Sequence, residues 1–197
     1  MLDGALGLAP VSSPSHVLDI ATGTGIWAVE FAEQYPLSHV IGTDLSQIQP
    51  HGRLSNCEFI REDSESSQWI FPYLFDYIHL RNIVWCFDDT KTVFKKAFDH
   101  MTPGGWIECQ DPSLKMYSMD GSFEGTESDQ YASLMLEGLE KIGRVGNRIP
   151  LYKAWLGEVG FVDVVERIIP CPVGRFKHRS FPPFCSVSRS SVPGFGM

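Results

Sequence analysis

The stretch Val17–Trp27 reads "VLDIATGTGIW" and is the most informative part of the sequence. An apolar run of strand type reaches Asp19, two glycines follow two residues apart, and a helical pattern begins. Glycine at this density before a helix lets the backbone approach a ligand closely. The stretch therefore predicts a ligand site at the end of a first strand, and two cofactor classes use nearly this phrase.

The length and composition indicate one globular domain. The chain has 197 residues, of which 43% are hydrophobic and 20% charged, so it is long enough to bury a substantial core. The net charge is -8 and no cluster of Lys and Arg forms a phosphate-binding face, which argues against a nucleic-acid partner. All 24 acidic residues lie at or before Glu166, whereas the segment after it is basic and rich in Ser, Pro and Phe.

The cysteine and histidine patterns exclude several other classes. The five cysteines are scattered without a C-x-x-C pair, which favours a reducing compartment over a disulfide framework or a zinc knuckle. The six histidines show no metal-binding spacing. We find no signal peptide and no apolar run long enough to cross a membrane. We therefore expect a soluble cytoplasmic or nuclear protein that binds no metal and no membrane.

Strand and helix patterns alternate along the chain, which predicts an α/β fold with a parallel sheet covered by helices on both faces. Thr90 is the expected N-cap of the second helix. The expected strands are 16–20, 39–44, 57–63, 75–80, 106–110 and 161–169, and the expected helices are 26–35, 90–101, 128–142 and 150–159.

Two readings of the glycine loop compete. Residues 23–28 fit G-x-G-x-x-A, the dinucleotide fingerprint, whereas a P-loop is excluded because no Gly-Lys-Ser/Thr follows. Asp44 follows Gly25 by 19 residues, and its carboxylate suits a neutral ribose diol. The second reading is a site for S-adenosylmethionine, and Asp19 favours it. A carboxylate repels the pyrophosphate of a dinucleotide but attracts the ammonium and sulfonium groups of S-adenosylmethionine.

Five motifs in order carry a family resemblance: "VLDIATGTGIWAVEFAEQYP", "VIGTDLSQIQP", "NCEF" with its following acids, "FDYIHLRN" and "PGGWIECQD". From about Leu2 to Gly174 the chain resembles the class I S-adenosylmethionine-dependent methyltransferases, and more narrowly the fungal LaeA-like group. The resemblance implies a Rossmann-like, doubly wound, mostly parallel sheet in a single domain.

The resemblance also implies a set of cofactor-binding residues. The methionine end of S-adenosylmethionine would lie against Asp19, Ala21, Gly23 and Gly25, the ribose on Asp44, the adenine beside Leu45, Asp63 and Ser64, and the substrate mouth near Arg81 and Asn82. No catalytic residue is assigned, because methyl transfer from a sulfonium needs mainly positioning and exclusion of water. The candidates for a general base, if one is needed, are His79, Glu108, Gln110 and Asp111.

The chain departs from the family pattern at three points. Ala21 stands where the family usually has glycine, which implies weakened binding. The chain starts where the family usually has a preceding helical segment, and its tail after Gly174 shows no strand pattern. We therefore expect a lead-in over 1–15, a methyltransferase domain over 16–174 and an irregular, disordered tail over 175–197, as in a truncated gene product. Whether the last antiparallel strand forms is left open.

The predicted function is methyl transfer to an unknown acceptor, a small molecule or a protein, with a link to fungal secondary metabolism. One alternative is a non-catalytic regulatory or scaffold protein that keeps the fold and works in a protein complex. A weaker alternative is an NAD-dependent oxidoreductase, which the G-x-G-x-x-A match supports and the absence of a Tyr-x-x-x-Lys motif opposes.

Overall fold

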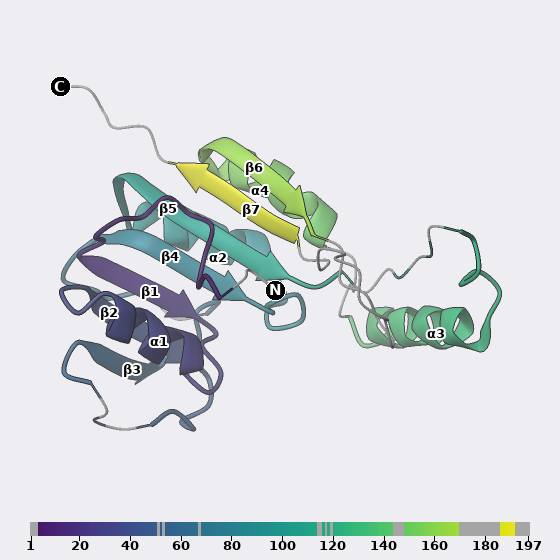
Figure 1. The fold of residues 1–197 in the computed structure, drawn as a ribbon, viewed down its shortest axis with the longest axis horizontal. Helices are drawn as coiled ribbons and strands as arrows, with labels where there is room; N and C mark the ends of the chain where they lie inside the picture. Colours follow the sequence, from purple (N-terminus) through teal and green to yellow (C-terminus); the bar gives the residue numbers. More distant parts are fainter. Residues whose placement is uncertain are drawn as a thin grey trace.

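The computed structural model describes residues 4–50, 52, 54–66, 68–113, 116, 118, 120–143, 148–169 and 186–191. A seven-stranded sheet forms its centre, with the strand order β3-β2-β1-β4-β5-β7-β6 (Figure 1). The strands are β1 (His16–Ile20), β2 (His39–Asp44), β3 (Cys57–Arg61), β4 (Phe75–Arg81), β5 (Met101–Asp111), β6 (Val162–Ile168) and β7 (Ser186–Ser191). The predicted α/β class and mostly parallel sheet are confirmed.

The first five strands pair in parallel, so their carboxyl ends lie at one edge of the sheet. From β1 the chain builds outward through β2 and β3 on one side, and through β4 and β5 on the other. The strand order therefore reverses between β1 and β4. Open α/β sheets bind ligands outside the carboxyl ends of their strands at such a switch point.

The last antiparallel strand is present. β7 pairs antiparallel with β5 on one side and with β6 on the other. The prediction of an irregular tail over 175–197 is therefore wrong for residues 186–191, and the rest of that tail lies outside the described residues. The serine-rich sequence "SVSRSS" has no apolar alternation. The strand forms through backbone hydrogen bonds to β5 and β6. Backbone pairing places no requirement on residue type, so no pattern in the sequence predicts this strand.

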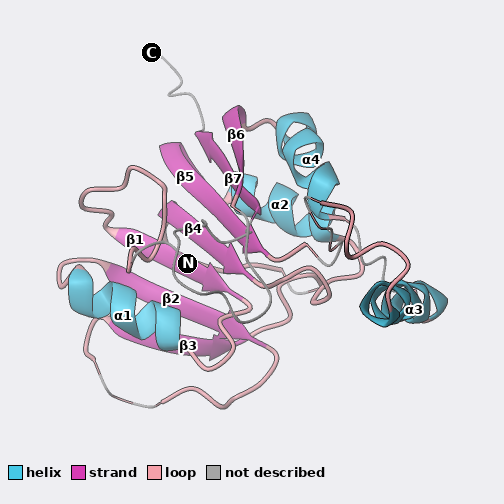
Figure 2. Ribbon diagram, turned by 45° about the vertical axis from the view of Figure 1, so that its right-hand side comes forward, coloured by secondary structure: helices cyan, strands magenta, loops and turns pink. Residues whose placement is uncertain are grey.

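The helices begin and end within two residues of the predicted positions: α1 (Ile26–Gln34), α2 (Thr90–Asp99), α3 (Glu127–Lys141) and α4 (Tyr152–Val159), the last preceded by a 3₁₀ turn (Ile149–Leu151). Figure 2 shows α1 on one face of the sheet and α2 and α4 on the other. Asp89, not Thr90, caps α2, because its carboxylate accepts hydrogen bonds from the Lys91 and Thr92 amides while Thr90 is buried.

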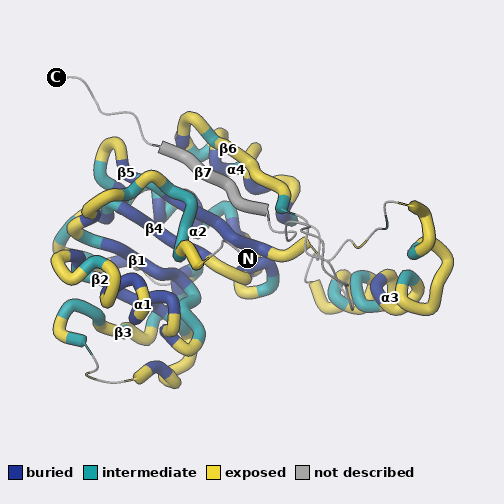
Figure 3. Tube along the Cα trace, viewed as in Figure 1, coloured by how far each residue is buried: buried dark blue, intermediate teal, exposed yellow. Residues whose placement is uncertain are grey.

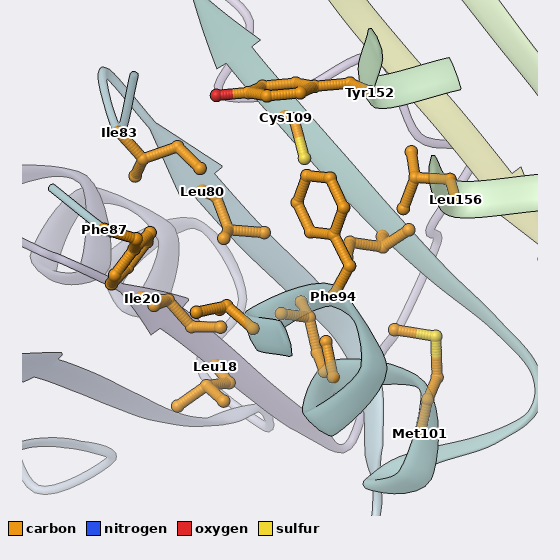
Figure 4. Packing of buried hydrophobic residues seen from close by; sticks show 14 of the residues in the cluster. Leu18, Ile20, Leu80, Ile83, Phe87, Phe94, Met101, Cys109, Tyr152 and Leu156 are labelled. Carbon is orange, nitrogen blue, oxygen red and sulfur yellow. The ribbon is translucent and has the colours of Figure 1, made fainter. Parts of the chain in front are cut away.

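Each face of the sheet has its own apolar core. On one face, side chains of α2 and α4 such as Phe94 and Leu156 pack on Leu18 and Leu80 (Figure 4). On the other, a smaller cluster joins Trp27 and other α1 side chains to β1, β2 and β4. The tube in Figure 3 is accordingly buried along the central strands.

Residues 4–15, called the N-terminal strap below, belong to the folded domain. In Figure 1 this purple segment runs across β4 and β5 before it enters β1. The Leu8 and Ala9 amides donate to the buried carboxylate of Glu108 on β5, at 2.8 Å each. At the other end of the strap, the Ser15 amide donates to Asp76 on β4 at 2.7 Å. The strap is therefore held to the sheet by hydrogen bonds at both of its ends.

Helix α3 lies apart from the sheet in Figures 1 and 2. Its N-cap is Thr126, whose hydroxyl accepts from the Asp129 amide, and Ala132 is its buried residue. Tyr131 and Leu134 are each 66% exposed. Within the described part of the chain, no helix has the length and apolar character needed to cross a membrane.

Candidate functional site

The glycine loop joins β1 to α1 through three residues in the left-handed region. Ala21, Gly23 and Gly25 have φ angles of 56°, 60° and 77°. Glycine adopts this region freely, whereas alanine carries a steric cost of about 1 kcal/mol or more. The departure at Ala21 therefore matters through backbone conformation rather than through the room a methyl group occupies.

The two loop glycines differ in what surrounds them. A Cβ added to Gly25 would lie 2.5 Å from the Phe59 ring, so a side chain is excluded there. A Cβ added to Gly23 would meet nothing within 4 Å. Gly23 therefore presents bare backbone on the open side of the loop, where a ligand can approach.

Asp19 lies beneath the loop. It is 2% exposed, and its two carboxylate oxygens contact the Thr22 hydroxyl at 2.5 Å and His79 Nδ1 at 2.7 Å. Both oxygens are thus engaged inside the protein. The Asp19 carboxylate thus supports the loop from below, and its contact with the methionine end of a cofactor stays a prediction.

Asp44 connects the end of β2 to the loop. Its Oδ2 accepts from the Gly23 amide and its Oδ1 from the Ser46 amide, both at 2.8 Å. A carboxylate oxygen has two acceptor positions, so each oxygen keeps one for a further donor. The half-buried Asp44 carboxylate is therefore placed beside the open side of Gly23 with acceptor capacity remaining.

The residues that the resemblance assigns to the adenine are less closely grouped than Asp44 and Gly23. Leu45 is 61% exposed and follows Asp44 directly. Asp63 closes a turn by accepting from the Glu65 amide and from the amide and hydroxyl of Ser66, and the hydrogen bonds from Ser66 lower the pKa of its carboxyl. Ser64 is buried, with its hydroxyl 3.3 Å from that of Thr43. In this arrangement Asp63 and Ser64 serve the β3–β4 connection.

Arg81 and Asn82 lie at the carboxyl end of β4, as predicted, and both are exposed. Asn82 has a φ of 59°, a left-handed conformation that asparagine tolerates better than most residues. Its amide donates to the Gln110 carbonyl at 2.9 Å. These two residues therefore lie at the switch point, next to the end of β5.

The four candidate bases are all buried. His79 and Glu108 are 0% exposed, and Glu108 accepts from the strap amides, from the Tyr77 hydroxyl at 2.9 Å and from Gln110 at 2.9 Å. Burial and the Glu108 carboxylate raise the pKa of Tyr77, which keeps its hydroxyl a donor. Burial also raises the pKa of Asp111 to about 6. No candidate is open to a substrate in this arrangement.

Gln49 is a site residue that the sequence reasoning missed. It is 7% exposed, and its side-chain amide donates to the Gly23 carbonyl at 2.6 Å and to the Ser46 carbonyl at 3.1 Å. A lone glutamine in a loop carries no signal of such a role. Among the described residues, no group of three or more His, Cys, Asp or Glu side chains is arranged to hold a metal ion.

Comparisons with known proteins agree with this geometry. A family profile described as "Methyltransferase domain" matches residues 5–162. The methyltransferase pytC of Aspergillus terreus is 34% identical over 180 residues, which cover 88% of this chain and 54% of that protein. The secondary metabolism regulator laeA of Aspergillus fumigatus is 28% identical over 167 residues, covering 84% and 45%. The chain thus spans about half the length of these relatives.

The fold recurs in solved structures. A Haemonchus contortus phosphoethanolamine N-methyltransferase in complex with S-adenosyl-L-methionine superposes with a TM-score of 0.68 at 15% identity, over 94% of this chain and 50% of that one. The apo form of the methyltransferase SibL superposes with a TM-score of 0.60 at 20% identity, over 95% and 53%. The family match overturns the oxidoreductase alternative, and the chain belongs to the methyltransferase domain family, with similarity to the fungal proteins pytC and laeA.

Proposed function

We propose that this chain binds S-adenosylmethionine at the glycine loop and transfers its methyl group to an acceptor that is a small molecule or a protein. The observation that carries the proposal is the contact between Asp44 and Gly23. It holds a carboxylate with remaining acceptor capacity against bare backbone, at the point where the strand order reverses.

The residues present fit the adenosine part of the cofactor. A neutral ribose diol donates two hydrogen bonds, and Asp44 keeps one acceptor position on each oxygen. Leu45 offers exposed apolar surface next to it for the adenine ring. Gly23 leaves room for close approach. The fit is weaker at the methionine end, because Asp19 faces inward. The backbone of the loop and Arg81 would hold this end of the cofactor.

The chemistry asks little of the protein beyond position. The bound cofactor supplies a methyl group activated by a sulfonium. The residues of this chain would orient the cofactor and exclude water from the carboxyl edge of the sheet. No protein nucleophile is required, and no base is assigned because the four candidates are buried.

The first test is calorimetric titration of the purified chain with S-adenosylhomocysteine, with NAD as the competing ligand. We expect saturable binding of S-adenosylhomocysteine alone. The Asp44→Ala variant should bind about tenfold more weakly or worse, because a charged hydrogen-bond acceptor is lost. Asp99→Ala, which removes an exposed partner of Lys95, is the matched control and should bind as the wild type does.

Two outcomes would contradict the proposal. Binding of NAD in place of S-adenosylhomocysteine would assign a different cofactor. A folded chain that binds neither ligand would favour the second candidate function, a non-catalytic regulatory protein. That candidate draws support from the relatives named as secondary metabolism regulators.

The cellular setting is part of the proposal. We place the protein in the cytoplasm or nucleus, a choice supported by Cys57 and Cys109, which form no disulfide within the described part of the chain. An acceptor linked to fungal secondary metabolism is supported by the names of its relatives, pytC and laeA.

A further inference from the structure

His79 is a buried histidine in the middle of β4, directly opposite Asp19 of β1 in the strand register. It is 0% exposed. Its ring stacks on the Trp27 indole, with centroids 3.7 Å apart and planes 5° from parallel. The ring is therefore fixed from two sides, by a hydrogen bond to β1 and by an aromatic contact with the first turn of α1.

A chain of hydrogen bonds runs from His79 to the glycine loop. His79 Nδ1 lies 2.7 Å from one Asp19 oxygen, and the Thr22 hydroxyl donates to the other. Thr22 then fixes the loop through its backbone: its amide donates to the Thr43 carbonyl at 2.9 Å, and its carbonyl accepts from the Gly25 amide at 3.0 Å. The orientation of His79 thus affects Thr22, the residue around which the loop turns, through their shared hydrogen bonds to Asp19.

The second ring nitrogen indicates which tautomer the ring adopts. Nε2 is buried and has no hydrogen-bond partner among the described residues. In folded proteins a buried N–H without an acceptor is rarer than a buried acceptor without a donor. The neutral tautomer with its proton on Nδ1 satisfies this constraint. His79 then donates to Asp19, whose carboxylate stays an acceptor for Thr22.

We propose that His79 is a positioning residue for the cofactor loop, acting through Asp19 and Thr22, and is not the general base of the reaction. The inference rests on the proposed function, because it concerns the affinity of the same loop for S-adenosylmethionine. An apolar ring would reproduce the stacking on Trp27. It would not reproduce the donation to Asp19, so the hydrogen bond is the part that serves the site.

Two variants of His79 separate these roles. The side-chain amide of asparagine places its NH₂ near the position of Nδ1, whereas that of glutamine places it near Nε2. We expect His79→Asn to bind S-adenosylhomocysteine within about threefold of the wild type, and His79→Gln to bind at least tenfold more weakly. Both variants lose the ring stacking, so their melting temperatures should fall by similar amounts while their affinities differ.

Thr22→Val provides a second route that leaves the core intact. It removes the hydroxyl that donates a hydrogen bond to Asp19 but leaves the His79 ring and its stacking on Trp27 in place. We expect it to weaken binding of S-adenosylhomocysteine about tenfold, with a smaller fall in melting temperature than either His79 variant because the ring stacking is kept. Combined with His79→Gln it should add little further loss, because the two residues act along one chain of contacts.

The outcomes distinguish this inference from the proposed function. A wild-type chain that does not bind S-adenosylhomocysteine would overturn both. If the wild type binds, equal affinities for His79→Asn and His79→Gln would overturn the inference alone. Fully additive losses for Thr22→Val and His79→Gln would do the same. Rescue by asparagine together with non-additivity would establish it.

Discussion

The two faces of the central sheet are closed in different ways. Beneath α2 and α4, apolar side chains such as Phe94 and Leu156 pack on the strands. Beneath α1 and the N-terminal strap, a row of polar side chains crosses three neighbouring strands at one register level, formed by Asp19, His79 and Glu108. All three are at most 2% exposed.

This contrast shows how irregular segments, here the glycine loop and the N-terminal strap, are held against the sheet. Apolar contacts have no preferred direction, so they attach helices but leave the path of an irregular segment open. Hydrogen bonds to buried carboxylates fix single backbone groups. Asp19 fixes the glycine loop in this way through Thr22, and Glu108 fixes the strap through Leu8 and Ala9.

The largest expected effect is on the polar face. Glu108→Gln keeps the shape of the side chain but turns one acceptor into a donor, which then faces the strap amides or the Tyr77 hydroxyl. We expect a loss of about 3 kcal/mol or more in unfolding free energy, because buried donors lose a charged acceptor. Urea unfolding measures it.

Glu58→Gln is the control for this change. Glu58 is 53% exposed and contacts His39 at 3.4 Å, so its loss should shift the free energy of unfolding by less than about 1 kcal/mol. Equal effects of the two variants would contradict the proposed role of the buried carboxylate.

The next effect concerns Asp111, the carboxylate buried on the apolar face. Burial raises its pKa from 3.8 to about 6, and the Ile83 amide and the nearby Tyr152 hydroxyl offset this only in part. The folded state therefore binds its proton more tightly than the unfolded state does. Stability should fall as the pH rises from about 4 to about 6, by about 3 kcal/mol from this group.

Urea unfolding between pH 4 and pH 7 tests the sign of this dependence. Asp111→Asn cannot ionise, so its unfolding free energy should lack the decrease that Asp111 contributes over that range. Wild-type and variant curves that stay parallel across this range would show that Asp111 does not bind its proton in the folded state as described.

A smaller effect is expected from a shape change on the apolar face. Leu156 is 0% exposed and packs in the cluster of α2 and α4. Leu156→Met conserves volume and should cost less than about 1.5 kcal/mol. Chemical denaturation gives the value. A cost as large as that of Glu108→Gln would remove the contrast between the two faces.

The sequence predicted those features that are local. The five parallel strands, the loop glycines and Asp44 follow from periodicity and from spacing within about thirty residues. The strap was missed because its acceptor, Glu108, lies 100 residues from Leu8 in the chain. Strand β7 was missed because its residues carry no apolar alternation.

The candidate site was predicted in its positions more than in its orientations. Asp19 does lie at the end of β1, but strand alternation turns its side chain toward the face under α1, where His79 and Thr22 engage it. No sequence pattern shows which buried partner will take a carboxylate. Gln49 illustrates the same limit, since its contact with Gly23 depends on the path of a loop.

The smallest expected effect concerns Ala21 in the glycine loop, which the polar face of the sheet supports. Ala21 has a φ of 56°, so Ala21→Gly should relieve its steric cost and raise stability by about 1 kcal/mol. Ala28→Gly in α1 is the control, since glycine in a helix should lower stability by at least a similar amount at this buried position. A loss of stability in Ala21→Gly would mean that the contact of the Ala21 methyl with the apolar core outweighs the strain. A gain in both stability and S-adenosylhomocysteine affinity would mean that the strained alanine limits the loop that Asp19 supports.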